Sequence, residues 1–374
     1  MPKIRVLVVD DAVVMRRVIT NVLSTDPAIE VVGFAANGKI ALQKIPQVTP
    51  DVITLEVEMP EMDGIQTLRE IRKLYPKLPV IMFSTLVQRG AEVTIEALSI
   101  GANDYVTKPA NVGSVTESMK RLGDDLIPKI KAHCKHLVPI ETLSALSLRP
   151  LSPPQSPRPK LTTPLSHDAP NIVCIGTSTG GPNALAEVFS GIRTRLPVPI
   201  VIVQHMPPIF TRMLAERLNN NSHATVFHEG EEGQRLEPGH AYIAPGGRHM
   251  EIRRLGQNPA IHLHDGPPEN SCRPAVDVLF RSVVSVFSNR ILAVIMTGMG
   301  QDGYRGCQLI HERQGQIITQ DEASSVVWGM PGYVAHAGIA EAVVPLSRIA
   351  YEISKRFDRS PRLPLRPTAS THPA

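Results

Sequence analysis

Short apolar runs alternate with amphipathic segments along most of the chain. In residues 3–125 the apolar runs predict five buried strands, at Ile4–Val9, Ile29–Ala35, Val52–Val57, Pro79–Ser84 and Asp104–Thr107. Segments with helical periodicity lie between them, at Val13–Leu23, Ile40–Ile45 and Ile65–Leu74. Nearly uniform apolar strands that alternate with helices are typical of a parallel sheet covered on both faces. We therefore predict a doubly wound α/β domain over residues 3–125.

The same alternation returns over residues 171–357 and predicts a second doubly wound α/β domain. Its strands are expected at Ile172–Ile175, Ile200–Gln204, Ala241–Ala244, Ile291–Met296 and Gln316–Thr319. Two further apolar stretches, Met250–Arg253 and Ile261–His264, are close enough in sequence to pair as an inserted hairpin. The fold class is thus α/β, with two parallel-sheet domains.

The two domains are separated by a linker, which we place at residues 126–170. Residues 139–170 contain eight prolines, a composition that favours extended polyproline conformations. Residues 358–374 hold four more prolines and are predicted to be a disordered tail.

Composition excludes several classes of protein. The net charge is +4, but residues 126–170 and 355–374 together carry a charge of +8, so the two domains are slightly acidic. No basic helix or aromatic-interleaved patch indicates nucleic-acid binding, and no apolar run approaches the roughly 18 residues of a membrane span. The four cysteines include no CxxC pair, which argues against a disulfide framework and fits a reducing compartment. We expect a cytoplasmic protein.

Polar residues stand at the carboxyl ends of the predicted strands of the first domain, where doubly wound sheets bind ligands. They are Asp10, Asp11, Glu56, Ser84 and Lys108. Three carboxylates at one sheet edge repel each other unless a cation joins them, and oxygen ligands suit Mg²⁺. The hydroxyl and the ammonium group would then face an anion such as a phosphoryl group. A set of solvated loop residues is the alternative interpretation.

The first domain resembles a response-regulator receiver domain in the segments VLVVDD, EMPEMDG, PVIMFST and DYVTKPA. The resemblance implies Mg²⁺ at Asp10 and Asp11, phosphoryl recognition by Ser84 and Lys108, and a histidine kinase as partner. At the position of the family's phosphoacceptor Asp, however, this chain has Glu56. One extra methylene moves the carboxylate out of line for attack on phosphorus. Three interpretations remain: an unphosphorylated charge mimic, a degenerate scaffold, or retained phosphorylation.

The second domain opens with the motif Gly176-Thr-Ser178-Thr-Gly180-Gly-Pro182 between a predicted strand and a predicted helix. A Gly-x-Ser-x-Gly motif in that context is typical of a nucleophile elbow, in which helix amides can stabilise an oxyanion. A glycine loop that cradles phosphate is an equally good interpretation of the motif alone. A dinucleotide site is less favoured because GxGxxG is absent.

A serine nucleophile needs a base and an orienting acid. His205 follows the strand Ile200–Gln204, and Asp302 lies in the turn after the strand Ile291–Met296. With Ser178, they would share one edge of one sheet. The chain order Ser, His, Asp differs from that of α/β-hydrolases and indicates another strand order.

The second domain resembles the catalytic domain of chemotaxis protein-glutamate methylesterases in GTSTGGP, VIVQHMPPIF, YIAPGGRHM, CRPAVDVLF and MTGMGQDG. The resemblance implies hydrolysis of glutamate γ-methyl esters on chemoreceptor cytoplasmic helices, with release of methanol, and deamidation of receptor glutamines. It makes Ser178 the nucleophile, His205 the base and Asp302 the orienting acid, with Thr179 beside the nucleophile and the Met299 amide as an oxyanion donor. No metal or cofactor is expected for catalysis.

The resemblance also implies that the receiver covers the active-site edge until it is activated. Arg273 and His249 are the nearest candidates for substrate contacts. Three other functions remain open: a signalling adaptor that has lost its regulation, a general esterase of small substrates, and a chemosensory esterase with an output other than chemotaxis.

Overall fold

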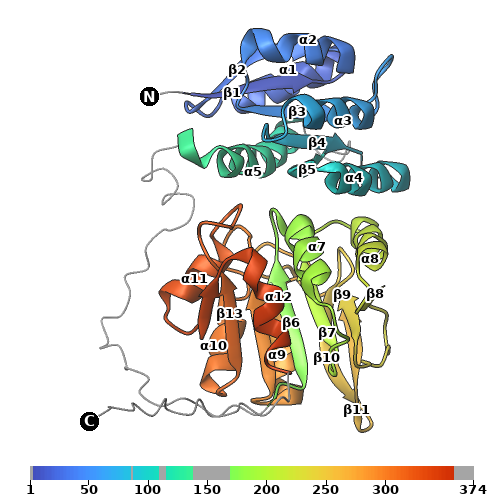
Figure 1. The fold of residues 1–374 in the computed structure, drawn as a ribbon, viewed down its shortest axis with the longest axis vertical. Helices are drawn as coiled ribbons and strands as arrows, with labels where there is room; N and C mark the ends of the chain where they lie inside the picture. Colours follow the sequence, from blue (N-terminus) through green and yellow to red (C-terminus); the bar gives the residue numbers. More distant parts are fainter. Residues whose placement is uncertain (1–2, 86, 109–114, 138–168, 358–374) are drawn as a thin grey trace, which may run out of the picture.

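The computed structural model contains two α/β domains, one above the other in Figure 1. The structure describes residues 3–85, 87–108, 115–137 and 169–357. Most of the predicted linker and the whole predicted tail therefore lie outside the described residues. Within the described residues, no helix is both long and apolar enough to cross a membrane.

The first domain has a five-stranded parallel sheet in the order β2-β1-β3-β4-β5. The strands are β1 (Ile4–Val9), β2 (Ile29–Ala35), β3 (Val52–Glu56), β4 (Val80–Ser84) and β5 (Asp104–Thr107). β1, β3 and β4 are buried over almost their whole length, as the uniform apolar runs predicted. The order reverses beside β1, which places the ends of β1 and β3 next to each other.

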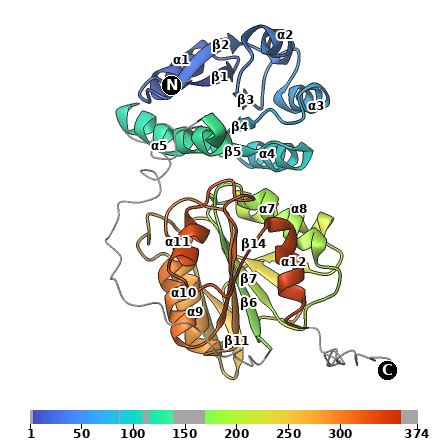
Figure 2. The ribbon, with the colours of Figure 1, turned by 60° about the vertical axis from the view of Figure 1, so that its left-hand side comes forward.

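Helices cover both faces of this sheet (Figures 1 and 2). One face carries α1 (Val13–Leu23) and α5 (Val115–His133), and the other carries α2 (Gly38–Val48), α3 (Gly64–Leu74) and α4 (Gln88–Ile100). α5 continues beyond residue 125, where we ended the domain, and a short 3₁₀ turn (Lys135–Leu137) follows it. The helix continues because Leu126 and Ile130 are fully buried against the sheet. The first part of the predicted linker is thus helical.

The second domain has a seven-stranded parallel sheet in the order β14-β13-β12-β6-β7-β9-β8. Its strands are β6 (Ile172–Thr177), β7 (Ile200–Gln204), β8 (Val226–Glu229), β9 (His240–Ile243), β12 (Ile291–Ile295), β13 (Gln316–Gln320) and β14 (Ala342–Val344). β8 and β14 were not predicted from the sequence. Both are short edge strands with partly exposed side chains, so neither forms a uniform apolar run.

Three helices pack on each face of the second sheet. They are α7 (Gly181–Gly191), α8 (Phe210–Asn221) and α12 (Leu346–Ser354) on one face, and α9 (Val276–Phe287), α10 (Tyr304–Glu312) and α11 (Met330–His336) on the other. The predicted hairpin is confirmed as an antiparallel pair, β10 (His249–Leu255) and β11 (Asn258–His264), which packs beside α9.

The first domain sits on the second through α4 and β5, which face α7 and α8 in both views (Figures 1 and 2). The rings of Tyr105 and Phe210 stack with centroids 5.0 Å apart. The Asn183 amide donates to the carbonyl of Ala102 at 3.0 Å. Buried apolar residues of both domains form one continuous cluster. The contact is therefore a packed interface that lies close to the start of α7.

Candidate active site

The sheet order of the second domain brings three predicted site residues to one edge. Thr177 of β6 is in register with Gln204 of β7, so Ser178 and His205 leave adjacent strands at the same level. β12 pairs with β6 on its other side, and the turn after β12 carries Asp302. β6 is the point at which the strand order reverses, where open parallel sheets form their ligand crevice.

The turn after β6 holds Ser178 in a constrained position. Its amide donates to the carbonyl of Thr297 at 3.0 Å, and its carbonyl accepts from the Gln204 side chain at 2.9 Å. The left-handed residue of the turn is Gly180, with φ 77°, which caps α7. A Cβ on Gly298 would stand 2.9 Å from the Ser178 Cβ, so only glycine fits there. The predicted strand, turn and helix are confirmed.

Asp302 is the most firmly held side chain of the site. Its Oδ2 accepts from His205 Nε2 at 2.8 Å and from the Val276 amide at 2.6 Å. Its Oδ1 accepts from the Asn270 side chain at 2.8 Å and from the Asp277 amide at 3.0 Å. Burial would raise the pKa of this carboxyl, but the His205 hydrogen bond and these amides hold it below its usual value. Asp302 is therefore a fixed carboxylate.

His205 lies between two acidic groups. Nε2 faces Asp302, and Nδ1 lies 3.5 Å from the thiol sulfur of Cys272. Burial lowers the pKa of the imidazole, but Asp302 and Cys272 outweigh burial and raise it to about 10. Among the described residues, no hydrogen bond joins Ser178 to His205. In this structure the Cys272 thiol contacts Nδ1, the ring nitrogen that would have to accept the proton of a serine nucleophile.

Cys272, Asn270 and Asp277 were not predicted as site residues from the sequence. Asp277 accepts from the Asn270 side chain at 2.9 Å and helps to orient it toward Asp302. All three residues stand in the short segment ENSCRPAVD, before and at the start of α9. A single sequence offers no signal for their roles, because only the fold brings this segment to the end of β12.

Thr179 and Met299 lie in the two turns that flank Ser178. Thr179 is buried, and its carbonyl accepts from the Thr297 hydroxyl at 2.9 Å. Met299 is partly exposed and follows Gly298, whose backbone lies against Ser178. Within the described residues, neither amide has a hydrogen-bond acceptor. Both amides are therefore available as hydrogen-bond donors.

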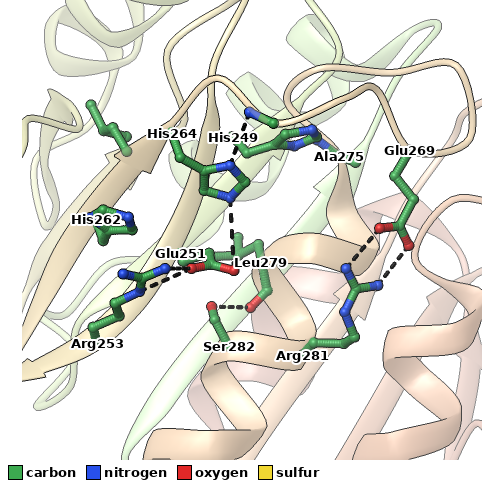
Figure 3. Close-up of polar contacts among 12 residues, drawn as sticks. His249, Glu251, Arg253, His262, His264, Glu269, Ala275, Leu279, Arg281 and Ser282 are labelled. Carbon is green, nitrogen blue, oxygen red and sulfur yellow. Dashed lines mark hydrogen bonds and ion pairs between the residues drawn. The ribbon is translucent and has the colours of Figure 1, made fainter.

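His249 does not lie where we expected a substrate contact, whereas a substrate contact of the exposed Arg273 stays a prediction. His249 is buried, accepts from the Ala275 amide at 3.3 Å through Nδ1, and faces the Pro267 carbonyl through Nε2 at 3.0 Å. Figure 3 shows it packed beside His264, between the hairpin and the start of α9. Arg273 donates to the carbonyls of Asp265 and Gly266 at 3.0 Å each. Both side chains hold the loop before α9 in place.

In the first domain, Glu56 and Lys108 form a close ion pair at the predicted pocket. Glu56 is 3% exposed, and its Oε1 accepts from the Val57 amide at 3.0 Å. Lys108 Nζ also lies 3.5 Å from Asp10 Oδ2. Burial raises the pKa of Glu56 although Lys108 opposes it, and the two acids raise the pKa of Lys108 although burial opposes them.

The expected convergence of three carboxylates is wrong in one respect. Asp11 is exposed, and in the described residues Asp10, Asp11 and Glu56 do not form a group compact enough for one metal ion. Asp10 Oδ2 is buried and has no hydrogen-bond partner among those residues, but the Lys108 ammonium lies 3.5 Å away and already supplies a positive charge there. Ser84 donates to the Gly90 carbonyl at 2.9 Å, within its own turn, and not toward Lys108. Binding of Mg²⁺ stays a prediction.

The fold and the two strand-end sites define a class, a doubly wound α/β enzyme domain joined to a domain with the receiver fold. Two family models match the chain accordingly. Residues 6–120 match the response regulator receiver domain, and residues 173–353 match the CheB methylesterase.

Relatives match over nearly the whole length. A protein-glutamate methylesterase/protein-glutamine glutaminase from Trichodesmium erythraeum is 51% identical, over 96% of this chain and 100% of that protein. One from Nocardioides is 49% identical, over 96% and 97%. A solved methylesterase catalytic domain from Thermotoga maritima is 37% identical, with a TM-score of 0.48 over 50% of this chain and 98% of its own. The chain belongs to the protein-glutamate methylesterase/protein-glutamine glutaminase family and is such an enzyme, with a receiver domain.

Proposed function

We propose that Ser178, His205 and Asp302 catalyse the hydrolysis of glutamate γ-methyl esters on the cytoplasmic helices of methyl-accepting chemoreceptors. The same residues would deamidate receptor glutamines, and the protein would work in the cytoplasm. The observation that carries the proposal is the 2.8 Å contact between His205 Nε2 and Asp302 Oδ2 at the sheet edge from which Ser178 also emerges.

In this mechanism the Ser178 hydroxyl attacks the ester carbonyl while the imidazole takes its proton. Because Nε2 donates to Asp302, the accepting nitrogen is Nδ1. The hydroxyl must therefore replace the Cys272 thiol at Nδ1 when substrate binds, and catalytic hydrogen bonds of free enzymes commonly tighten only then. The amides of Met299 and Thr179 would stabilise the oxyanion. Methanol leaves with the proton from His205, and water hydrolyses the acyl-enzyme by the same steps.

The receiver would regulate access to this edge. Its contact with Asn183, in the first turn of α7, lies five residues after Ser178. On the receiver side, Glu56 already pairs with the lysine that would bind a phosphoryl group. This pairing supports the interpretation that Glu56 is a permanent charge and is not phosphorylated. A chemotaxis histidine kinase would then be a docking partner rather than a phosphodonor.

The test is methanol release from membranes that contain methylated chemoreceptors. Ser178→Ala should lower the rate by at least about 1,000-fold, because it removes the proposed nucleophile. Ser190→Ala is the matched control: this exposed serine near the end of α7 donates its hydroxyl to the Glu187 carbonyl, and its loss should change nothing. Wild-type turnover by Ser178→Ala would overturn the proposed nucleophile.

Two comparisons separate the remaining functions. A signalling adaptor would release no methanol with either the wild type or the control variant. A general esterase would hydrolyse a small methyl ester as efficiently as the methylated receptor. We expect a strong preference for the receptor, because the edge must accept a side chain presented on a helix.

A further inference from the structure

Cys272 lies at the active-site edge but has no task in the proposed chemistry. Its sulfur is 3.5 Å from His205 Nδ1, and its side chain is partly exposed. The other three cysteines of the chain, Cys134, Cys174 and Cys307, are buried. Cys272, His205 and Asp302 each offer an atom that metals bind, and these atoms lie within 4.8 Å of one another. In the described residues no other three His, Cys, Asp or Glu side chains meet this condition.

The separation of the two donor atoms fits a zinc ion. With Zn–S near 2.3 Å and Zn–N near 2.0–2.1 Å, two ligands of a tetrahedral ion stand about 3.6 Å apart. The observed distance from sulfur to Nδ1 is 3.5 Å. A zinc ion in place of the thiol proton would therefore need little movement of either side chain.

Asp302 completes the arrangement from the other side of the ring. Metal-binding histidines usually donate their second N–H to a carboxylate, which fixes the tautomer and makes the ligand more basic. His205 donates to Asp302 at 2.8 Å, and four further donors hold that carboxylate: the Asn270 side chain and the amides of Val276, Asp277 and Gly303. The supporting shell of a metal ligand is thus already built.

We propose that Cys272 Sγ and His205 Nδ1 form an inhibitory site for Zn²⁺ or another thiophilic divalent ion, with Asp302 orienting the imidazole. Water or the Ser178 hydroxyl would fill the remaining positions. The ion occupies the nitrogen that accepts the proton of Ser178, so the metal-bound enzyme cannot start the reaction. Binding of the ion requires only the geometry, whereas inhibition rests on the proposed function of His205 as the base.

The first experiment measures binding to the full chain with Co²⁺ as the spectroscopic substitute for zinc. A thiolate-to-cobalt absorption band should appear in the near ultraviolet and disappear when Zn²⁺ is added. Cys272→Ser should abolish the band, whereas Ser178→Ala should keep it. The ring nitrogens of His228 and His240 lie 2.9 Å apart and could also attract a metal ion. His240→Gln is the control for that pair and should keep the band. A band that survives in Cys272→Ser, or no band in the wild type, would overturn the site.

The second experiment measures methanol release. Zn²⁺ should inhibit the wild type at micromolar concentration, EDTA should reverse the inhibition, and Mg²⁺ should have no effect because it prefers oxygen ligands. For each protein, inhibition is measured against its own rate without zinc. The zinc concentration that halves this rate should be at least tenfold higher for Cys272→Ser than for the wild type. Carboxamidomethylation of the native protein should modify Cys272, the one partly exposed cysteine. It should abolish the cobalt band, as Cys272→Ser does. A cysteine-dependent band without inhibition would support the site and contradict His205 as the base.

Discussion

The two domains place acidic side chains at equivalent strand ends but hold them differently. In the catalytic domain, Asp302 accepts from three amides and one side-chain amide besides His205, so its position does not depend on its partner. In the receiver, two backbone amides hold only the Oε1 atom of Glu56, and its Oε2 faces Lys108. Asp10 Oδ2 has no hydrogen-bond partner among the described residues and lies 3.5 Å from the same lysine. Topology alone thus supplies an acidic edge. The surrounding donors decide whether an acid is ready for chemistry.

Asp302→Asn should have the largest effect in this comparison. The amide cannot stabilise an imidazolium or keep the proton on Nε2, so the rate of methanol release should fall by about 1,000- to 10,000-fold. The Asn side chain keeps one acceptor oxygen, but its NH2 group must face either the Val276 amide or the amides of Asp277 and Gly303, so the thermal unfolding temperature should also fall. A rate within tenfold of the wild type would show that Asp302 only fixes the loop.

Glu56→Asp should restore the chemistry that the receiver lacks. The shorter carboxylate regains the in-line position, so a small phosphodonor should produce acid-labile phosphate on the variant and none on the natural protein. Methanol release by the variant should then respond to the phosphodonor. Stoichiometric phosphate on the natural protein, absent from Glu56→Gln, would contradict this prediction.

Glu56→Gln separates the two other interpretations of the receiver. If Glu56 acts as a permanent charge, the basal rate of methanol release should fall in the variant. If the domain is a degenerate scaffold, the rate should stay unchanged. Met82, a buried neighbour on β4, provides a control for general loosening of the core through Met82→Leu.

Cys272→Ser should shift the pH dependence of methanol release. The base must be deprotonated, so activity rises with pH through the pKa of His205, which Asp302 and Cys272 raise to about 10. Removing the cysteine lowers that pKa, so the profile should move to lower pH and activity at pH 7 should increase. Lowering the pKa of the base by about 1 should raise the activity at pH 7 about tenfold. An unchanged profile would show that the thiol does not influence the base.

The smallest effect is expected at the interface between the domains. The Arg217 guanidinium of α8 is buried, donates to the Leu98 carbonyl of the receiver at 3.2 Å and to the Asn183 side chain at 2.9 Å. Two of its nitrogens have no partner in the described residues, and burial lowers its pKa to about 10. The unpaired atoms weaken the contact.

Arg217→Ala removes the hydrogen bond to the Leu98 carbonyl of the receiver and leaves a cavity beside Asn183, so it should loosen the interface and raise the basal rate of methanol release by a few-fold. Arg212→Ala, on the exposed side of the same helix, is the control and should have no effect. A lower rate in Arg217→Ala with unchanged stability would mean that the interface supports catalysis rather than covering the site.

Much of this protein could be predicted from the sequence by itself. Uniform apolar runs identified the central strands, because a strand buried on both faces must be apolar throughout, and residues at their ends located Ser178, His205 and Glu56. Edge strands such as β8 were missed because half-exposed side chains carry no such pattern.

Only the tertiary structure decided how the site is held together. Asn270 and Cys272 precede α9 in sequence, and no local pattern links them to His205, 65 and 67 residues earlier. Hydrophobic periodicity reports which face of an element is buried, whereas hydrogen bonds between loops depend on the order of strands in the sheet. The same reason explains why the prediction for His249 was wrong. Its place in the motif suggested a substrate contact, but its side chain is buried behind the hairpin and has a structural role.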